Sequence, residues 1–224
     1  MTNKLKGLTS ICLIVLVICI SGCSINDATG ETQYNLISDE EEVNLGRQVN
    51  VKILDQYGVY KNKSLQTYIN QIGQNLVETS GRDTIEYHFY ILDTPIINAF
   101  ALPGGYVYIT RGTLAQMNSE AELAFVLGHE IGHIVGKHGA QKMSQILTLG
   151  AVFETAKLIM GEKGTKDWTP IVGTIAGLAI KGYGRENEFE ADLLGIQNAI
   201  RSEYHPETSA QFLTTLKRQE KYQP

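Results

Sequence analysis

Two histidines and a glutamate interrupt a stretch of the chain that is otherwise almost entirely apolar. His129, Glu130 and His133 lie within residues 123–135, in the order His-Glu-x-x-His. On a helix, side chains four residues apart share a face, so both imidazoles can present a ring nitrogen to one metal ion. Glu130 lies about 100° further around the helix, beside that metal, where it can act as general base on an attacking water. The spacing therefore predicts zinc-assisted hydrolysis.

A catalytic zinc ion usually has three protein ligands and one open position, so a third ligand must come from elsewhere in the chain. Glu188 and Asp192 are four residues apart on a helix predicted over 185–202, and they share a face. We expect Glu188 to be the third ligand. Asp192 is placed to accept a hydrogen bond from the second ring nitrogen of a ligand histidine, which would orient that ring. Glu190 lies on a different face and is not expected to bind the metal.

The competing interpretation is a buried helix that contains two core histidines. A helix over 119–135 that is apolar on nearly every side is expected to be buried, and its polar groups then need partners. Core histidines alone do not account for Glu130, or for the matching pair Glu188 and Asp192, so we favour the metal site. His138 is expected to end this helix rather than to bind metal.

The residues that would position this site fall into helices and strands. Helices are expected from the capping box Ser38–Glu41, from about Ser64, over 119–135, 143–160 and 185–202, and from Pro206. Strands are expected over 85–92 and at Tyr106–Thr110. We expect the second strand to be an edge strand lining the cleft. Tyr106, Val107 and Tyr108 would then bind an extended substrate through main-chain hydrogen bonds.

The first residues have the pattern of an export signal. Lys4 and Lys6 precede an apolar run over 8–20, and small residues follow. The segment Ile20-Ser21-Gly22-Cys23 also matches the bacterial lipobox. That resemblance implies cleavage before Cys23 and lipid attachment to its sulfur. The alternative is an uncleaved N-terminal anchor with an incidental cysteine.

Three parts are therefore expected: a signal peptide over 1–22, a tether over 23–37 and a zinc metallopeptidase domain over 38–224. Ser24, in place of an aspartate, favours the outer membrane, facing the periplasm, under the sorting rule for bacterial lipoproteins. Of the chain's 3 cysteines only Cys23 would remain after cleavage, so no disulfide is expected.

Composition narrows the classes of function. The chain has 224 residues, 43% of them hydrophobic, which suits one domain with a sizeable core. A net charge of -5 indicates no basic face, so nucleic acid is not an expected partner. The apolar segments 147–160 and 170–180 are shorter than the ~20 residues that a membrane span needs, which disfavours an intramembrane protease.

Taken together, these motifs resemble those of the BepA and LoiP group of envelope metallopeptidases, which share peptidase family M48 with HtpX and the CAAX prenyl proteases. The resemblance covers residues 36–215 and rests on His129–His133, Glu188–Asp192, Asn98–Gly105 and Leu36–Gly46. It implies one zinc ion per chain, bound by His129, His133 and Glu188, with Glu130 as base. It also implies an α+β, mostly helical, zincin-like fold with a small β-sheet beside the active-site helix.

The same resemblance implies that unfolded or misassembled envelope proteins are the substrates, in protein quality control at a lipid-anchored site in the bacterial cell envelope. The alternative is a non-proteolytic zinc-binding lipoprotein that acts as a chaperone or assembly factor, and the intact Glu130 argues against it. Larger members of the group carry a C-terminal helical-repeat domain; with its end at Pro224, this chain is expected to be a minimal version. His205 stands where members often have aspartate, and we expect a surface residue there, with an oxyanion hydrogen-bond donor as the alternative.

Overall fold

The computed structural model describes residues 23–160, residue 177 and residues 182–205. Its elements are β1 (Cys23–Ile25), β2 (Thr32–Tyr34), α2 (Asp39–Tyr57), α3 (Lys63–Glu78), β3 (His88–Leu92), β4 (Ala99–Leu102), β5 (Tyr106–Thr110), α4 (Arg111–Leu114), α5 (Glu120–Val135), α6 (His138–Met160) and α8 (Arg185–Arg201). The predicted signal peptide over 1–22 and the helix predicted from Pro206 lie outside the described residues. Within them, no helix has the length and apolar character to cross a bilayer.

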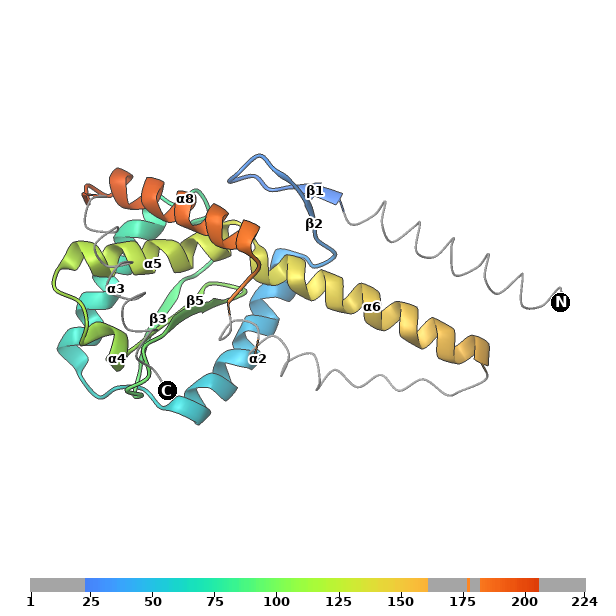
Figure 1. Cartoon of the computed structure of the whole chain (residues 1–224), viewed down its shortest axis with the longest axis horizontal. Coiled ribbons are helices and arrows are strands. Elements are labelled where there is room, and N and C mark those ends of the chain that lie inside the picture. Colours follow the sequence, from blue (N-terminus) through green and yellow to red (C-terminus); the bar gives the residue numbers. More distant parts are fainter. Residues whose placement is uncertain (1–22, 161–176, 178–181, 206–224) are drawn as a thin grey trace.

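A small mixed sheet lies between helices, and α6 extends away from the body (Figure 1). The strand order is β3-β5-β4, with β3 parallel and β4 antiparallel to β5. Val107 and Ile109 pack with α3 and α5 on one face of the sheet. Tyr106 and Tyr108 pack with α2 on the other face. The expected α+β class, mostly helical with a small sheet beside the motif-bearing helix, is confirmed.

The prediction that Tyr106–Thr110 is an edge strand is wrong. β5 is the central strand, and its residues are all buried, with Tyr106 5% exposed and Tyr108 0% exposed. Its two backbone edges pair with β3 and β4, so a substrate strand cannot be added to it. An unbroken apolar run is typical of a strand that is covered on both faces. Tyr106, Val107 and Tyr108 are therefore core residues. The edge strands of this sheet are β3 and β4, and β4 was not predicted as a strand.

Side-chain caps define where two of the helices begin. The Ser38 side chain accepts a hydrogen bond from the backbone N–H of Glu41, whose carboxylate accepts from the Ser38 N–H, so the predicted capping box of α2 is confirmed. Ser119 caps α5 in the same way, through the backbone N–H of Glu122. The Glu122 carboxylate, however, accepts from the N–H of Asn118, one residue before the N-cap, instead of from the N–H of Ser119 as in a capping box.

Residues 23–37 do not form the expected tether. β1 and β2 pair as an antiparallel hairpin, and the side chains of Asn26 and Gln33 are buried, with exposures of 3% and 7%. Asn26 Nδ2 donates to the carbonyl of Val135 at 2.8 Å, and Gln33 Nε2 donates to that of Gly136 at 2.9 Å. The polar composition suggested a solvated linker because these partners lie more than a hundred residues away in sequence. The hairpin is therefore part of the folded unit.

Candidate metal centre

Three side chains from two helices converge at one point. His129 and His133 come from α5 and Glu188 comes from α8, and one ligand atom of each lies within 4.8 Å of the others. The two histidine Nε2 atoms are 3.1 Å apart, and the Glu188 carboxylate oxygens lie 3.5 Å and 3.7 Å from them. Tetrahedral ligands bound at ~2.0–2.1 Å from zinc are separated by about 3.3 Å. Two nitrogens and a carboxylate at this spacing therefore fit zinc.

Close packing of α5 against α8 makes this convergence possible (Figure 1). A Cβ atom on Gly132 would lie 2.8 Å from the carbonyl oxygen of Ala191, and one on Gly195 would lie 2.8 Å from the backbone nitrogen of His129. Gly128 belongs to the same seam, because its Cβ would lie 3.1 Å from the Gly195 carbonyl oxygen. The distance between packed helices depends on the side chains at their contact, so these glycines let the two backbones touch.

Asp192 supports His129 from the side that faces away from the centre. Its Oδ1 lies 2.9 Å from His129 Nδ1. A histidine that offers Nε2 to a metal carries its proton on Nδ1, so His129 donates this hydrogen bond to the carboxylate. The contact is the one that the four-residue spacing of Glu188 and Asp192 predicts.

His133 has a contact of the same kind that the sequence did not reveal. Its Nδ1 lies 2.8 Å from His138 Nδ1, and His138 Nε2 lies 3.1 Å from Glu190 Oε2. His138 was expected to end the motif helix, but it begins α6, directly after Lys137 turns the chain with a φ of 55°. Glu190 lies outside the ligand set, as its spacing predicts. The available signal was a third histidine five residues beyond the motif.

Tyr183 packs against the same histidines and was also missed. Its ring centroid lies 4.5 Å from that of His133 and 5.8 Å from that of His138. Its backbone N–H donates to Glu188 Oε1 at 2.8 Å, which holds the ligand carboxylate. Burial raises the pKa of the Tyr183 hydroxyl, so this group stays protonated.

Glu130 lies beside the three ligands and against the sheet. It is buried, with 6% exposed, and the backbone N–H of Ala101 in β4 donates a hydrogen bond to it. Burial raises the pKa of Glu130 to about 7, with the charge of Glu188 adding to the rise and His129 and the Ala101 N–H opposing it. A carboxyl group with a pKa near neutrality is suited to accept a proton and to return it.

The two ligand histidines have opposite pKa shifts in the metal-free chain. Burial lowers the pKa of His129, but hydrogen bonds to Asp192 and Glu188 outweigh it and raise the pKa to about 10. Burial lowers the pKa of His133 to about 2, and the charges of His129 and His138 add to this effect. The pKa of His138 is also lowered, mainly by burial. His133 and His138 are therefore neutral, whereas His129 must release a proton when a metal binds.

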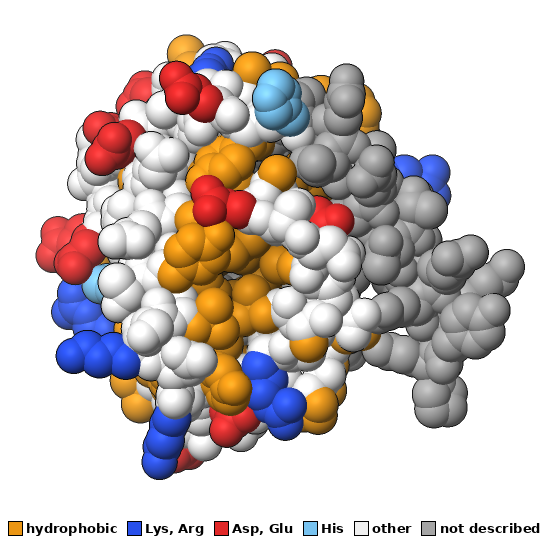
Figure 2. Space-filling view, turned by 90° about the vertical axis from the view of Figure 1, so that its left-hand side faces the viewer, with side chains coloured by type: hydrophobic (Ala, Val, Ile, Leu, Met, Phe, Trp, Pro, Cys, Tyr) orange, Lys and Arg blue, Asp and Glu red, His pale blue; other side chains and the backbone are white. Residues whose placement is uncertain are grey.

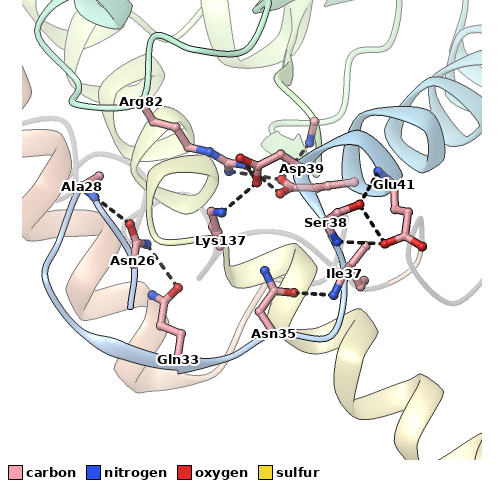
Figure 3. A network of polar contacts seen from close by, with 12 residues as sticks. Asn26, Ala28, Gln33, Asn35, Ile37, Ser38, Asp39, Glu41, Arg82 and Lys137 are labelled. Atoms are coloured by element: carbon pink, nitrogen blue, oxygen red, sulfur yellow. Dashed lines mark hydrogen bonds and ion pairs between the residues drawn. The ribbon is translucent and has the colours of Figure 1, made fainter. Parts of the chain in front are cut away.

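Side chains from distant segments hold the C-terminal end of α5. The carbonyls of residues 134–136 accept hydrogen bonds from Arg82 at 2.6 Å, Asn26 at 2.8 Å and Gln33 at 2.9 Å. The last carbonyls of a helix have no partner within the helix, so these bonds complete its hydrogen bonding. Figure 3 shows Asn26 and Gln33 reaching this turn from the hairpin, and Arg82 from the other side.

Arg82 belongs to a buried cluster of charges. Arg82 and Glu42 are 5% and 1% exposed, and their nearest charged atoms are 2.7 Å apart. Glu42 also accepts the backbone N–H of Gly104 at 3.0 Å, and Asp39 bonds to both Arg82 and Lys137 (Figure 3). Partial burial raises the pKa of Asp39, but the hydrogen bond from Lys137 and the charge of Arg82 lower it below its ordinary value. The cluster joins α2, the β4–β5 turn and the end of α5.

Two candidate residues lie away from the centre. His205 is exposed, and it follows Tyr204, whose hydroxyl donates to Glu120 at the start of α5 at 2.9 Å. The helix between Glu120 and His129 is ~13 Å long, so the structure does not bring His205 to the three ligands. Cys23 is exposed at the start of the hairpin, near the other end of α5.

A hollow of about 570 Å³ opens at the start of α5 (Figure 2). Its apolar lining includes Tyr60, Leu65, Leu114, Met117 and Leu123. None of the three candidate ligands lines it, so it is separate from the metal centre.

Gly195→Ala is expected to weaken metal binding. The new methyl group would lie 2.8 Å from the backbone nitrogen of His129, and overpacking of this kind typically costs about 1–3 kcal/mol. Because the backbone atoms can yield only if α8 moves away, we expect a lower thermal unfolding midpoint and a lower zinc affinity in titration. Gly150→Ala is the matched control, with nothing within 4 Å of the new methyl, and it should be neutral or stabilising by about 0.5–1 kcal/mol. Unchanged zinc affinity in Gly195→Ala would show that the seam does not position Glu188.

The chain is similar in sequence to known metallopeptidases. The model of Peptidase family M48 matches residues 63–222. The beta-barrel assembly-enhancing proteases of Yersinia pestis and Escherichia coli (strain K12) are 34% and 32% identical to it over 165 residues, which is 70% of this chain and 34% of each relative. The mitochondrial metalloendopeptidase OMA1 of Arabidopsis thaliana is 32% identical over 129 residues, or 57% of this chain and 25% of that protein. The chain thus spans about a third of the length of these bacterial relatives.

The matched region contains the whole candidate centre. Residues 63–222 include His129, Glu130, His133 and Glu188, as well as the sheet that lies beside them. The match extends over more than half of the sequence, and the ligand geometry agrees with a metal-dependent peptidase. The chain belongs to peptidase family M48.

Proposed function

We propose that this chain is a zinc metalloendopeptidase. The observation that carries the proposal is the convergence of His129, His133 and Glu188 beside the buried Glu130. Two histidines and a glutamate are the ligands of one class of catalytic zinc sites, which keep a fourth position open. A carboxylate next to the ligands, but outside the ligand set, can act as the general base of hydrolysis.

The proposed reaction is hydrolysis of a peptide bond with Glu130 as general base. Zinc bound at this centre supplies Lewis acidity. Glu130 accepts a proton from the attacking water and passes it to the leaving amine. The N–H of Ala101 holds the Glu130 carboxylate in place, and Asp192 keeps the His129 ring turned with Nε2 toward the centre.

An extended substrate is proposed to pair with β4. The N–H of Thr110 donates to the carbonyl of Asn98 at 3.0 Å, which makes these residues a hydrogen-bonded pair of the antiparallel ladder. Such pairs alternate, so Ala99 and Ala101 direct their N–H and C=O groups to the opposite edge of β4. The Ala101 N–H reaches Glu130, so this edge passes the proposed catalytic group. A peptide added here would be recognised mainly by its backbone.

Recognition of backbone suits substrates that expose extended segments. The bacterial relatives are named for enhancing β-barrel assembly. We therefore propose unfolded or misassembled envelope proteins as substrates, in protein quality control. A non-proteolytic chaperone or assembly factor would keep the metal ligands but would not need a buried carboxylate beside them.

The proposed location is the bacterial cell envelope, with the chain anchored by lipid at Cys23, on the outer membrane facing the periplasm. Cys23 is exposed at the first position of β1. Because the hairpin packs on the end of α5, a lipid at this residue would hold the domain close to the membrane without a flexible linker.

Substitution of the two glutamates should separate the chemistry from metal binding. Glu130→Gln keeps all three ligands, so zinc should remain at one per chain while peptide hydrolysis falls by about 10²–10⁴. Glu188→Ala removes a ligand oxygen, so zinc and activity should be lost together. Zinc stoichiometry and hydrolysis of casein, with and without chelator, measure both effects. Full zinc content and activity in Glu188→Ala would show that the third ligand is another residue.

Proline in the two strands should distinguish the substrate edge from the centre of the sheet. Ala99→Pro removes an N–H on the open edge of β4, so we expect a folded protein with normal zinc content and weaker peptide cleavage. Val107→Pro removes a ladder donor from the central strand and should prevent folding. Circular dichroism, zinc analysis and cleavage rates measure the difference. Wild-type cleavage by Ala99→Pro would place the substrate elsewhere.

Cys23→Ser should abolish lipid labelling and block cleavage of the chain before residue 23. The contacts of Asn26 and Gln33 with α5 do not involve the Cys23 side chain, so hydrolysis of a soluble peptide should be unchanged. Metabolic labelling with palmitate and the size of the processed chain are the measurements. Labelling and processing equal to wild type would contradict the lipid anchor at Cys23.

A further inference from the structure

A second carboxylate reaches the metal centre through an intervening histidine. Asp192 contacts His129 directly, whereas His133 contacts His138, and His138 contacts Glu190. His133 Nδ1 lies 2.8 Å from His138 Nδ1, and His138 Nε2 lies 3.1 Å from Glu190 Oε2. Each candidate ligand histidine is therefore connected to a carboxylate of α8, one directly and one through a neighbour.

The positions of the protons follow from the hydrogen-bonding capacity of imidazole. His133 turns Nε2 toward His129 and Glu188, so a metal bound there leaves the proton of His133 on Nδ1. His133 must then donate to His138 Nδ1, which has to be an acceptor. The remaining proton of His138 lies on Nε2 and is donated to Glu190. With neutral rings, this is the one arrangement in which both contacts are hydrogen bonds.

The surrounding residues confine His138 to this orientation. Its side chain is 0% exposed, and its ring lies over Gly136, where a Cβ would come within 2.5 Å of Nε2. The Tyr183 ring covers His133 and His138 from another side. Oε1 of Glu190 is buried and has no hydrogen-bond partner among the described residues, whereas Oε2 bonds to His138 and thereby ties this carboxylate to the ring.

We infer that His138 and Glu190 are positioning residues for the ligand His133. Glu190 orients His138, and His138 accepts the Nδ1 proton of His133 and thereby keeps His133 Nε2 directed at the metal. Partners of this kind raise the basicity of a ligand and typically change metal affinity by about 10–100-fold when they are removed. The inference rests on the proposed zinc site, and it adds residues that do not touch the metal.

A simple core role for His138 makes a different prediction. A residue that only fills space would stabilise the metal-free and the zinc-loaded protein equally, and an apolar side chain of similar volume would replace it. A positioning residue affects zinc binding specifically, and a side chain with an acceptor and a donor in place of the two ring nitrogens would rescue it. Glutamine has both groups.

The experiment compares zinc dissociation constants of the full chain by competition with a chromophoric chelator. We expect His138→Leu to weaken zinc binding by about 10–100-fold and His138→Gln to recover most of the loss. Glu190→Ala should weaken binding in the same range, whereas Glu186→Ala, which removes an exposed carboxylate of the same helix, should not. The visible spectrum of the cobalt-substituted protein should shift in His138→Leu and return toward wild type in His138→Gln.

The double variant His138→Leu/Glu190→Ala tests whether the two residues act in one chain of contacts. Because Glu190 acts through His138, the double variant should bind zinc no more weakly than His138→Leu. Additive losses, or zinc affinity within threefold of wild type in a folded His138→Leu or Glu190→Ala protein, would overturn the inference. If His138→Leu does not fold, Glu190→Ala and His138→Gln still decide the question. Failure of the wild type to bind zinc would overturn the proposed function instead.

Discussion

Backbone contact between α5 and α8 is the constraint on which the metal centre depends. The histidines belong to one helix and Glu188 to the other, and their ligand atoms meet within 4.8 Å. Helices normally pack with axes 8–10 Å apart, at a distance set by the side chains between them. Gly132 and Gly195 remove those side chains where the helices touch. A larger residue in the seam would separate the ligands even though all of them were still present.

The contact between α5 and α8 needs positions without side chains, whereas the C-terminal end of α5 needs polar side chains to bond its carbonyls. Burial of the Arg82–Glu42 pair costs desolvation energy of several kcal/mol per ion, which hydrogen bonds must offset. Glu42 accepts a hydrogen bond from the Gly104 N–H, and Arg82 donates one to the carbonyl of Ile134. Each charged group therefore also provides a partner for a backbone group. The β1–β2 hairpin also contributes, because Asn26 donates a hydrogen bond to the carbonyl of Val135 at the end of α5. The end of the helix is thereby fixed in three dimensions, and the two histidines, which lie in its last two turns, are fixed with it.

The carboxylates of α8 give the centre its charge. Glu188 and Asp192 favour a proton on His129 in the metal-free chain and raise its pKa to about 10. The same negative charge favours a divalent cation, so the proton and the metal compete for one site. Burial raises the pKa of Glu130 to about 7, the charge of Glu188 adds to the rise, and the charge of His129 opposes it. Helix α8 therefore supplies a ligand and also sets the electrostatic environment of His129 and of the adjacent Glu130 carboxyl group.

The sequence by itself determined the parts of this protein that depend on local periodicity. His129 and His133 share a face because a helix repeats every 3.6 residues, and Glu188 and Asp192 do so for the same reason. The capping box of α2 and the apolar helix α5 follow from equally local rules.

Only the tertiary structure decided which segments lie side by side. β5 was predicted as an edge strand, yet it is central, because strand order depends on pairings between segments distant in sequence. The polar run that contains Asn26 was predicted as a tether because its partners at the end of α5 lie more than a hundred residues away. His138 and Glu190 had no local pattern, since they meet only when α6 and α8 both pack against α5. Contacts between helices and strands far apart in the chain are made by packing and burial, which a local pattern of residues does not specify.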